Sequence, residues 1–164
     1  GFAPGEWTDD TAQAYSTAEV AATGADLRSD EALTSIARRL ADWYADGPSD
    51  VGIQTRAVLS AVGRRPSTEE MRQAARLVHD RTGRSAGNGS LMRTSAVALA
   101  HLDDPEALVE AAAGRARLAG CRATRCHPGA RGAVRRRAVR RTPCAPGQFA
   151  QQGLHDALEA LEGK

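Results

Sequence analysis

The stretch SDEALTSIARRLADWYADGP, residues 29–48, decides the fold class of this chain. Ser29 and Asp30 are good N-cap residues, and Gly47-Pro48 is a typical helix stop. Between these signals, apolar side chains recur at the spacing of one helix face: Leu33, Ile36, Ala37, Leu40 and then Trp43 or Tyr44. The pattern predicts an amphipathic helix that buries one face.

Similar patterns extend outward in both directions. Ser67 and Glu70 form a capping box before a helix that ends ahead of Gly83, and Asp104-Pro105 starts another helix. The composition is rich in alanine, and aromatic residues make up only 4% of the chain, which favours helices over strands. The remaining helices are expected near residues 10–22, 51–62 and 91–102. The sequence therefore predicts an all-α fold.

Charge divides the chain into two parts. Residues 1–110 carry 17 acidic and 11 basic side chains, whereas residues 111–155 contain ten arginines and no acid. Helical periodicity also stops near Gly114. We therefore expect a helical domain over residues 1–113 and an Arg-rich segment of doubtful fold over residues 114–164.

Three interpretations of the Arg-rich segment remain open. It is typical of a GC-rich gene translated in the wrong frame, because the patterning stops abruptly. A basic tail that binds nucleic acid is a weaker alternative, since no aromatic platform accompanies the charge. A zinc site is a third, although the Cys-x4-Cys-His spacing is poor for zinc, and its ligands would be Cys121, Cys126, His127 and Cys144.

The sequence contains no sign of a membrane or secretory segment. No apolar run approaches the roughly 20 residues that a membrane span needs. The start lacks a basic region followed by an apolar stretch, as a signal peptide would have. Three cysteines, an odd number, argue against a disulfide framework. We expect a cytoplasmic protein that does not bind membranes.

Two motifs could carry chemistry. In Trp7-Thr8-Asp9-Asp10-Thr11, a hydroxyl and adjacent carboxylates at a helix start can offer hard oxygen ligands that suit Mg²⁺ or Mn²⁺. The alternative is an ordinary helix cap. Residues 87–93, Gly-Asn-Gly-Ser-Leu-Met-Arg, lead into a helix, and the backbone amides of such a loop can cradle phosphate. The alternative there is a simple interhelical turn.

Together, in this order, the two motifs resemble the ADP-ribosylglycohydrolase family over residues 3–112. The resemblance also covers Asp50-Val51-Gly52 with Thr55 and Asp103-Asp104-Pro105. It implies an orthogonal helical bundle around two divalent cations, Mg²⁺ or Mn²⁺. It further implies that Thr8, Asp9 and Asp10 bind metal, with Asp9 and Asp10 as catalytic residues. The implied substrate-binding residues are Gly87, Asn88, Gly89, Ser90, Met92 and Arg93.

The activity implied by this resemblance is hydrolysis of the glycosidic bond between ADP-ribose and a protein side chain, arginine being the expected acceptor. The implied partner is an ADP-ribosylated protein or ADP-ribose itself, bound by a monomer, and nucleic acid is not expected. Paired cations could orient the ribose hydroxyls and polarise a water molecule.

The sequence departs from the family in ways that affect the metal site. An early glycine-rich helix of the family is missing, and the late Asp-x-Asp-Thr element has no counterpart. Thr8, Asp9 and Asp10 supply only part of one metal shell, because each cation needs about six oxygen ligands. The bundle is therefore expected to be incomplete, and the alternative function is an inactive fragment or an ADP-ribose-binding remnant.

Overall fold

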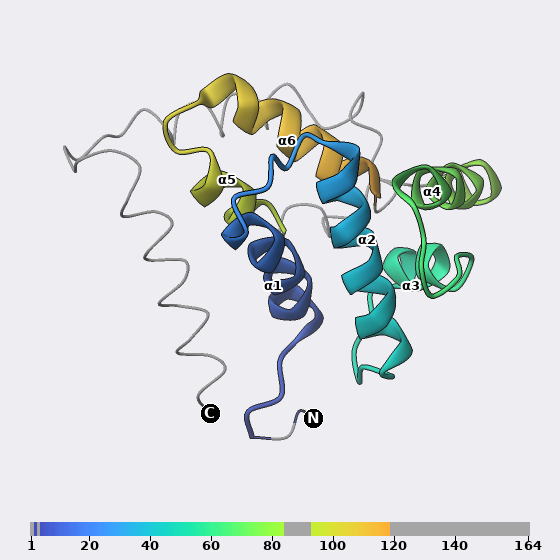
Figure 1. The fold of residues 1–164 in the computed structure, drawn as a ribbon. Helices are drawn as coiled ribbons and strands as arrows, with labels where there is room; N and C mark the ends of the chain where they lie inside the picture. The colour runs from blue at the N-terminus through green and yellow to red at the C-terminus, as the bar shows by residue number, and fades with distance from the viewer. Residues whose placement is uncertain (1, 3, 84–92, 119–164) are drawn as a thin grey trace.

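A computed structural model describes residues 2, 4–83 and 93–118 of the chain, and all regular structure in these residues is α-helical (Figure 1). This confirms the predicted all-α class. The helices are α1 (Asp9–Ala22), α2 (Asp30–Ala45), α3 (Ile53–Leu59), α4 (Thr68–Thr82), α5 (Thr94–Ala100) and α6 (Pro105–Leu118). No helix within these ranges is both long enough and apolar enough to cross a membrane.

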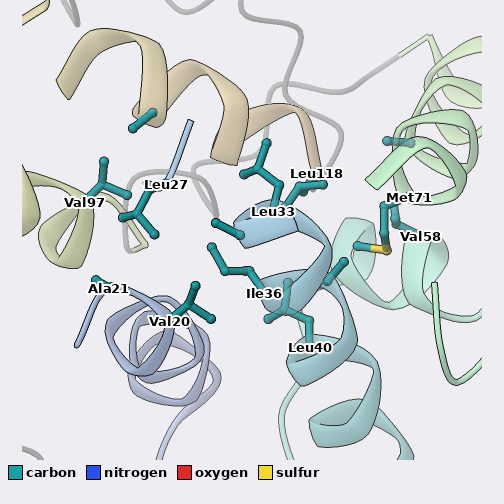
Figure 2. Close-up of a cluster of buried hydrophobic side chains, with 14 of the residues drawn as sticks. Val20, Ala21, Leu27, Leu33, Ile36, Leu40, Val58, Met71, Val97 and Leu118 are labelled. Atoms are coloured by element: carbon teal, nitrogen blue, oxygen red, sulfur yellow. The ribbon is translucent and has the colours of Figure 1, made fainter. Parts of the chain in front are cut away.

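Helix α2 lies at the centre of the bundle and contacts α1, α3, α4 and α6. Its predicted apolar face is buried, with Leu33, Ile36 and Leu40 each no more than 1% exposed. Figure 2 shows these side chains between two groups of neighbours. Val20, Leu27 and Val97 lie on one side of α2, and Val58 and Met71 lie on the other. One apolar stripe therefore joins both halves of the core.

The remaining helices form two groups on either side of α2. Helices α1 and α5 pack against each other on one side, and α3 and α4 pack against each other on the other (Figure 1). Helix α6 crosses between the groups, where it contacts α2, α4 and α5. The start of α1 and the start of α3 thus belong to different groups, and what links them decides whether their residues can form one site.

Local signals set most helix ends as the sequence predicts. The capping box of α4 is present, because the Glu70 amide donates to Ser67 Oγ at 3.2 Å and the Ser67 amide donates to Glu70 Oε2 at 2.7 Å. Helix α4 ends at Gly83, which has a φ of 62° that glycine adopts readily. At α6, Asp104 Oδ1 accepts from the amides of Glu106 and Ala107.

Helix α3 is shorter than its sequence pattern predicts. The expected range was residues 51–62, whereas the helix covers Ile53–Leu59. After Leu59 the amides of Ala61 and Val62 bond to carbonyls three residues back, so the chain tightens into turns. The apolar pattern continues through these turns because Val62 still packs against the core. Helix α5 likewise ends at Ala100, before the expected residue 102.

Helix α6 continues past the point where periodicity fails. It runs through Leu118, which is fully buried, so the helix does not end near Gly114 as the pattern indicated. A Cβ atom placed on Gly114 would lie 3.4 Å from Leu33 Cδ1, so α6 approaches α2 closely at this point. Arg115 is 2% exposed and donates through Nε to Thr17 Oγ1 of α1 at 2.9 Å. Contacts with α2 and α1 therefore stabilise the helix beyond the residues that its own apolar pattern covers.

The central role of α2 can be tested with a matched pair of isoleucines. Ile36 is 0% exposed, whereas Ile53 is 91% exposed. Ile36→Ala should lower the free energy of unfolding by about 2–5 kcal/mol, because it leaves a cavity in the core. Ile53→Ala should change it by less than about 0.5 kcal/mol. Urea unfolding measures both values, and similar losses for the two variants would contradict the described core.

Candidate functional site

The first turn of α1 carries the predicted metal-binding residues. Thr8 occupies the N-cap position but makes no capping hydrogen bond with its side chain. Its hydroxyl instead lies 3.5 Å from Thr11 Oγ1. Asp9 and Asp10 follow in the first turn, where the helix dipole favours negative charge. Helix capping therefore does not account for the Thr8 hydroxyl, and three oxygen-bearing side chains are grouped at one helix start.

Asp9 is held by groups from two helices. Gln13, one turn along α1 and fully buried, donates through Nε2 to Asp9 Oδ2 at 3.4 Å. The Gly52 amide, at the start of α3, donates to the same oxygen at 3.3 Å. A Cβ atom on Gly52 would lie 3.8 Å from that oxygen, which is ordinary van der Waals contact. The start of α3 therefore lies directly against Asp9.

Asp10 lies in a region where negative charge gathers. Its pKa is raised above the usual 3.8, first by desolvation, then by the charge of Asp9 and a hydrogen bond with it, and further by the charge of Asp50. The charge of Arg93 acts in the opposite direction. Excess negative charge of this kind is relieved by a bound cation.

Asp50 is a candidate site residue that the sequence prediction did not include. It lies just ahead of α3, and its charge contributes to the raised pKa of Asp10. The sequence did contain a signal, because Asp50 belongs to an Asp-Val-Gly segment that forms part of the family resemblance. That signal was not specific enough to assign a role, since the separation of 40 positions from Asp10 shows nothing about proximity.

Arg93 brings the second motif next to the first. It is 1% exposed, precedes α5, and donates through Nη2 to Thr55 Oγ1 of α3 at 2.9 Å. Burial lowers its pKa from 12.5 to about 10, while the charges of Asp9 and Asp10 act to raise it. Arg93 is thus electrostatically coupled to both carboxylates. The hydrogen bond to Thr55 ties Arg93 to α3.

The rest of the predicted site lies outside the described residues. This holds for Gly87, Asn88, Gly89, Ser90 and Met92, and also for the possible zinc ligands. Of the second motif, the structure therefore places only Arg93. The described part of the site consists of residues from α1, the start of α3 and the start of α5.

The donor set fits a divalent cation only in part. Hydroxyl and carboxylate oxygens at the start of α1 are the hard ligands that Mg²⁺ and Mn²⁺ prefer. Within the described ranges, however, no group of three or more His, Cys, Asp or Glu residues is arranged to hold a metal ion. These residues suit a cation that retains several water ligands, and they do not form a complete protein shell.

Comparison with known families identifies the family of the chain. A sequence model of the ADP-ribosylglycohydrolase family matches residues 1–160, so the chain belongs to that family. These proteins are hydrolases that act on ADP-ribose conjugates, and they generally depend on divalent metal ions. The match extends through the Arg-rich segment that follows residue 113. No curated protein and no solved structure matches the chain.

The charge balance around Asp10 predicts opposite effects for two Asp-to-Asn changes. The pKa of Asp10 is raised, so its ionised form is disfavoured in the folded chain, and stability falls as pH rises from 3.8 through the raised value. Asp10→Asn should therefore stabilise the metal-free protein at neutral pH.

The pKa of Asp104 is lowered, first by its hydrogen bond from the Ala107 amide. Asp104→Asn should therefore destabilise the protein, since the ionised form of Asp104 is favoured on folding. That contribution is present above 3.8 and is lost as pH falls through the lowered value. Urea unfolding of both variants across this pH range, without divalent cations, measures the two effects. Changes of the same sign at neutral pH would contradict the charge balance described.

Proposed function

We propose that this protein catalyses metal-dependent hydrolysis of the glycosidic bond that links ADP-ribose to a protein side chain, and that this side chain is arginine. Family membership supports the reaction class. The observation that carries the proposal is the electrostatic interaction of Asp9 and Asp10 with Arg93, which is the last residue of the motif at residues 87–93. In this reaction water supplies a hydroxyl to C1 of the ribose, and the side-chain nitrogen leaves with a proton.

In this proposal the start of α1 holds the metal. Thr8, Asp9 and Asp10 are the ligands, and Mg²⁺ or Mn²⁺ is the ion because all three donors are hard oxygens. The bound ion would supply Lewis acidity and orient the ribose hydroxyls. Asp9 is already oriented by Gln13 and by the Gly52 amide, so its position does not depend on the ion alone.

The Gly-Asn-Gly motif is proposed to bind the ADP-ribose portion. The backbone N–H groups of Gly87 and Gly89 would donate hydrogen bonds to the phosphates, with Asn88 and Ser90 adding side-chain hydrogen bonds. Met92 completes the proposed set. The proposed partner is an ADP-ribosylated protein or ADP-ribose, bound by a monomer.

A second candidate function is binding of ADP-ribose without turnover. The observation in its favour is that the described residues contain no group of three or more His, Cys, Asp or Glu arranged to hold a metal ion. The sequence also contains no Asp-x-Asp element that could add ligands. Binding and hydrolysis can be separated by experiment, since a remnant would bind ADP-ribose and release none from a modified protein.

The metal-ligand assignment predicts the effect of Asp9→Ala. The variant should lower kcat/KM for release of ADP-ribose from ADP-ribosyl-arginine by roughly 100-fold or more, because metal stabilisation of the transition state is worth several kcal/mol. Asp80→Asn, which changes an exposed carboxylate on α4, serves as the control and should retain full activity. Activity of Asp9→Ala equal to that of the control would exclude the proposed metal site.

The assignment of the glycine-rich loop predicts the effect of Asn88→Ala. Titration calorimetry with ADP-ribose, with and without Mn²⁺, should show a signal for the wild type and none for this variant. Gln73→Ala, which removes an exposed amide on α4, should bind as the wild type does. Undiminished binding by Asn88→Ala would remove the loop from the site, and binding without turnover in the wild type would support the second candidate function.

A further inference from the structure

We propose that Arg93 is a positioning residue, which ties α3 to the α1–α5 side of the bundle through Thr55 and so holds the Gly52 amide against the carboxylates of Asp9 and Asp10. The inference rests on the proposed function, since it assigns those carboxylates to the metal. It differs from a role in direct substrate contact, because the Arg93 side chain is 1% exposed.

The site lies where the two groups of helices meet. Helix α3 packs on α2 and α4, whereas α5 packs on α1 and α6 (Figure 1). Hydrogen bonds connect these groups close to the site, and one of them joins Ser49, ahead of α3, to Glu6, ahead of α1. Arg93 of the α5 side donates to Thr55 of α3 at 2.9 Å, and the Gly52 amide of the α3 side donates to Asp9 of α1 at 3.3 Å. The Gly52–Asp9 bond is the longer of these two, so the Arg93–Thr55 bond is expected to be the stronger.

The Arg93–Thr55 bond is also the directional contact that orients the guanidinium. Among the described residues, Nε and Nη1 of Arg93 have no hydrogen-bond partner. The charges of Asp9 and Asp10 attract the buried cation but do not set its geometry. Thr55 Oγ1 lies 3.9 Å from the position that a Cβ atom would take on Gly52. The hydroxyl that fixes Arg93 is therefore adjacent to the residue that contacts Asp9.

The chain contains a matched control for this contact. Arg115 is 2% exposed and donates to Thr17 Oγ1, also at 2.9 Å. Desolvation and the charge of Arg93 lower its pKa, and neither Asp9 nor Asp10 contributes to that shift. Thr17 lies two turns along α1 from Asp9, inside one helix group. Removing the Thr17 hydroxyl should affect a buried arginine without disturbing the hydrogen bond between Arg93 and α3.

The test compares Thr55→Val with Thr17→Val in the full chain. For Thr55→Val, the dissociation constant for Mn²⁺, measured by electron paramagnetic resonance of the free ion, should rise about tenfold, as expected for loss of one charge-assisted hydrogen bond. Hydrogen exchange at the Arg56 amide, which closes the first turn of α3 on Gly52, should accelerate by a similar factor without metal. Thr17→Val should match the wild type in both.

Arg93→Met separates positioning from charge. Removing a cation beside two carboxylates would by itself tighten Mn²⁺ binding, whereas loss of positioning weakens it, and we expect weaker binding. Tighter binding by Arg93→Met, or a Thr55→Val variant that behaves like Thr17→Val, would overturn the inference. If the wild type binds no Mn²⁺, the proposed function fails, and hydrogen exchange at Arg56 still decides whether Arg93 and Thr55 restrain α3.

Discussion

Burial of one face of α2 is the constraint on which the described structure depends. Leu33, Ile36 and Leu40 touch neighbours from both helix groups, so removing them from water stabilises two interfaces at once (Figure 2). Aromatic residues are scarce and alanine supplies much of the helix surface, so aliphatic side chains and alanine build the core. A bundle of this composition gains its core from close helix contacts, which places the starts of α1, α3 and α5 near one another.

Bringing these charged side chains together in the candidate site has an electrostatic cost. Asp9 and Asp10 repel each other, and Arg93 is removed from water beside them. Attraction between the cation and the two carboxylates offsets part of both costs, and a divalent ion would offset more. Such a balance is typical of sites that bind charged ligands, where residues are arranged for the complex and not for the stability of the free protein.

Much of the fold could be predicted from the sequence, because its signals are local. The Ser67 capping box, the Gly47-Pro48 stop and the α2 stripe each act within a few residues. The end of α6 could not be predicted, because Gly114 and Leu118 stay helical through contacts with distant residues. At the site, Thr8, Asp9 and Asp10 could be named from one motif. Their relation to others could not, since contacts such as Arg93–Thr55 span 38 positions.

The close approach of α6 to α2 has a consequence for how this chain can vary. The backbone at position 114 already lies against Leu33, and a methyl group there would just touch it. Alanine would fit and would favour the helix by roughly 0.5–1 kcal/mol, but a branched side chain would not fit. Positions 33 and 114 should therefore covary among relatives, a bulkier residue at one being tolerated only with a smaller residue at the other.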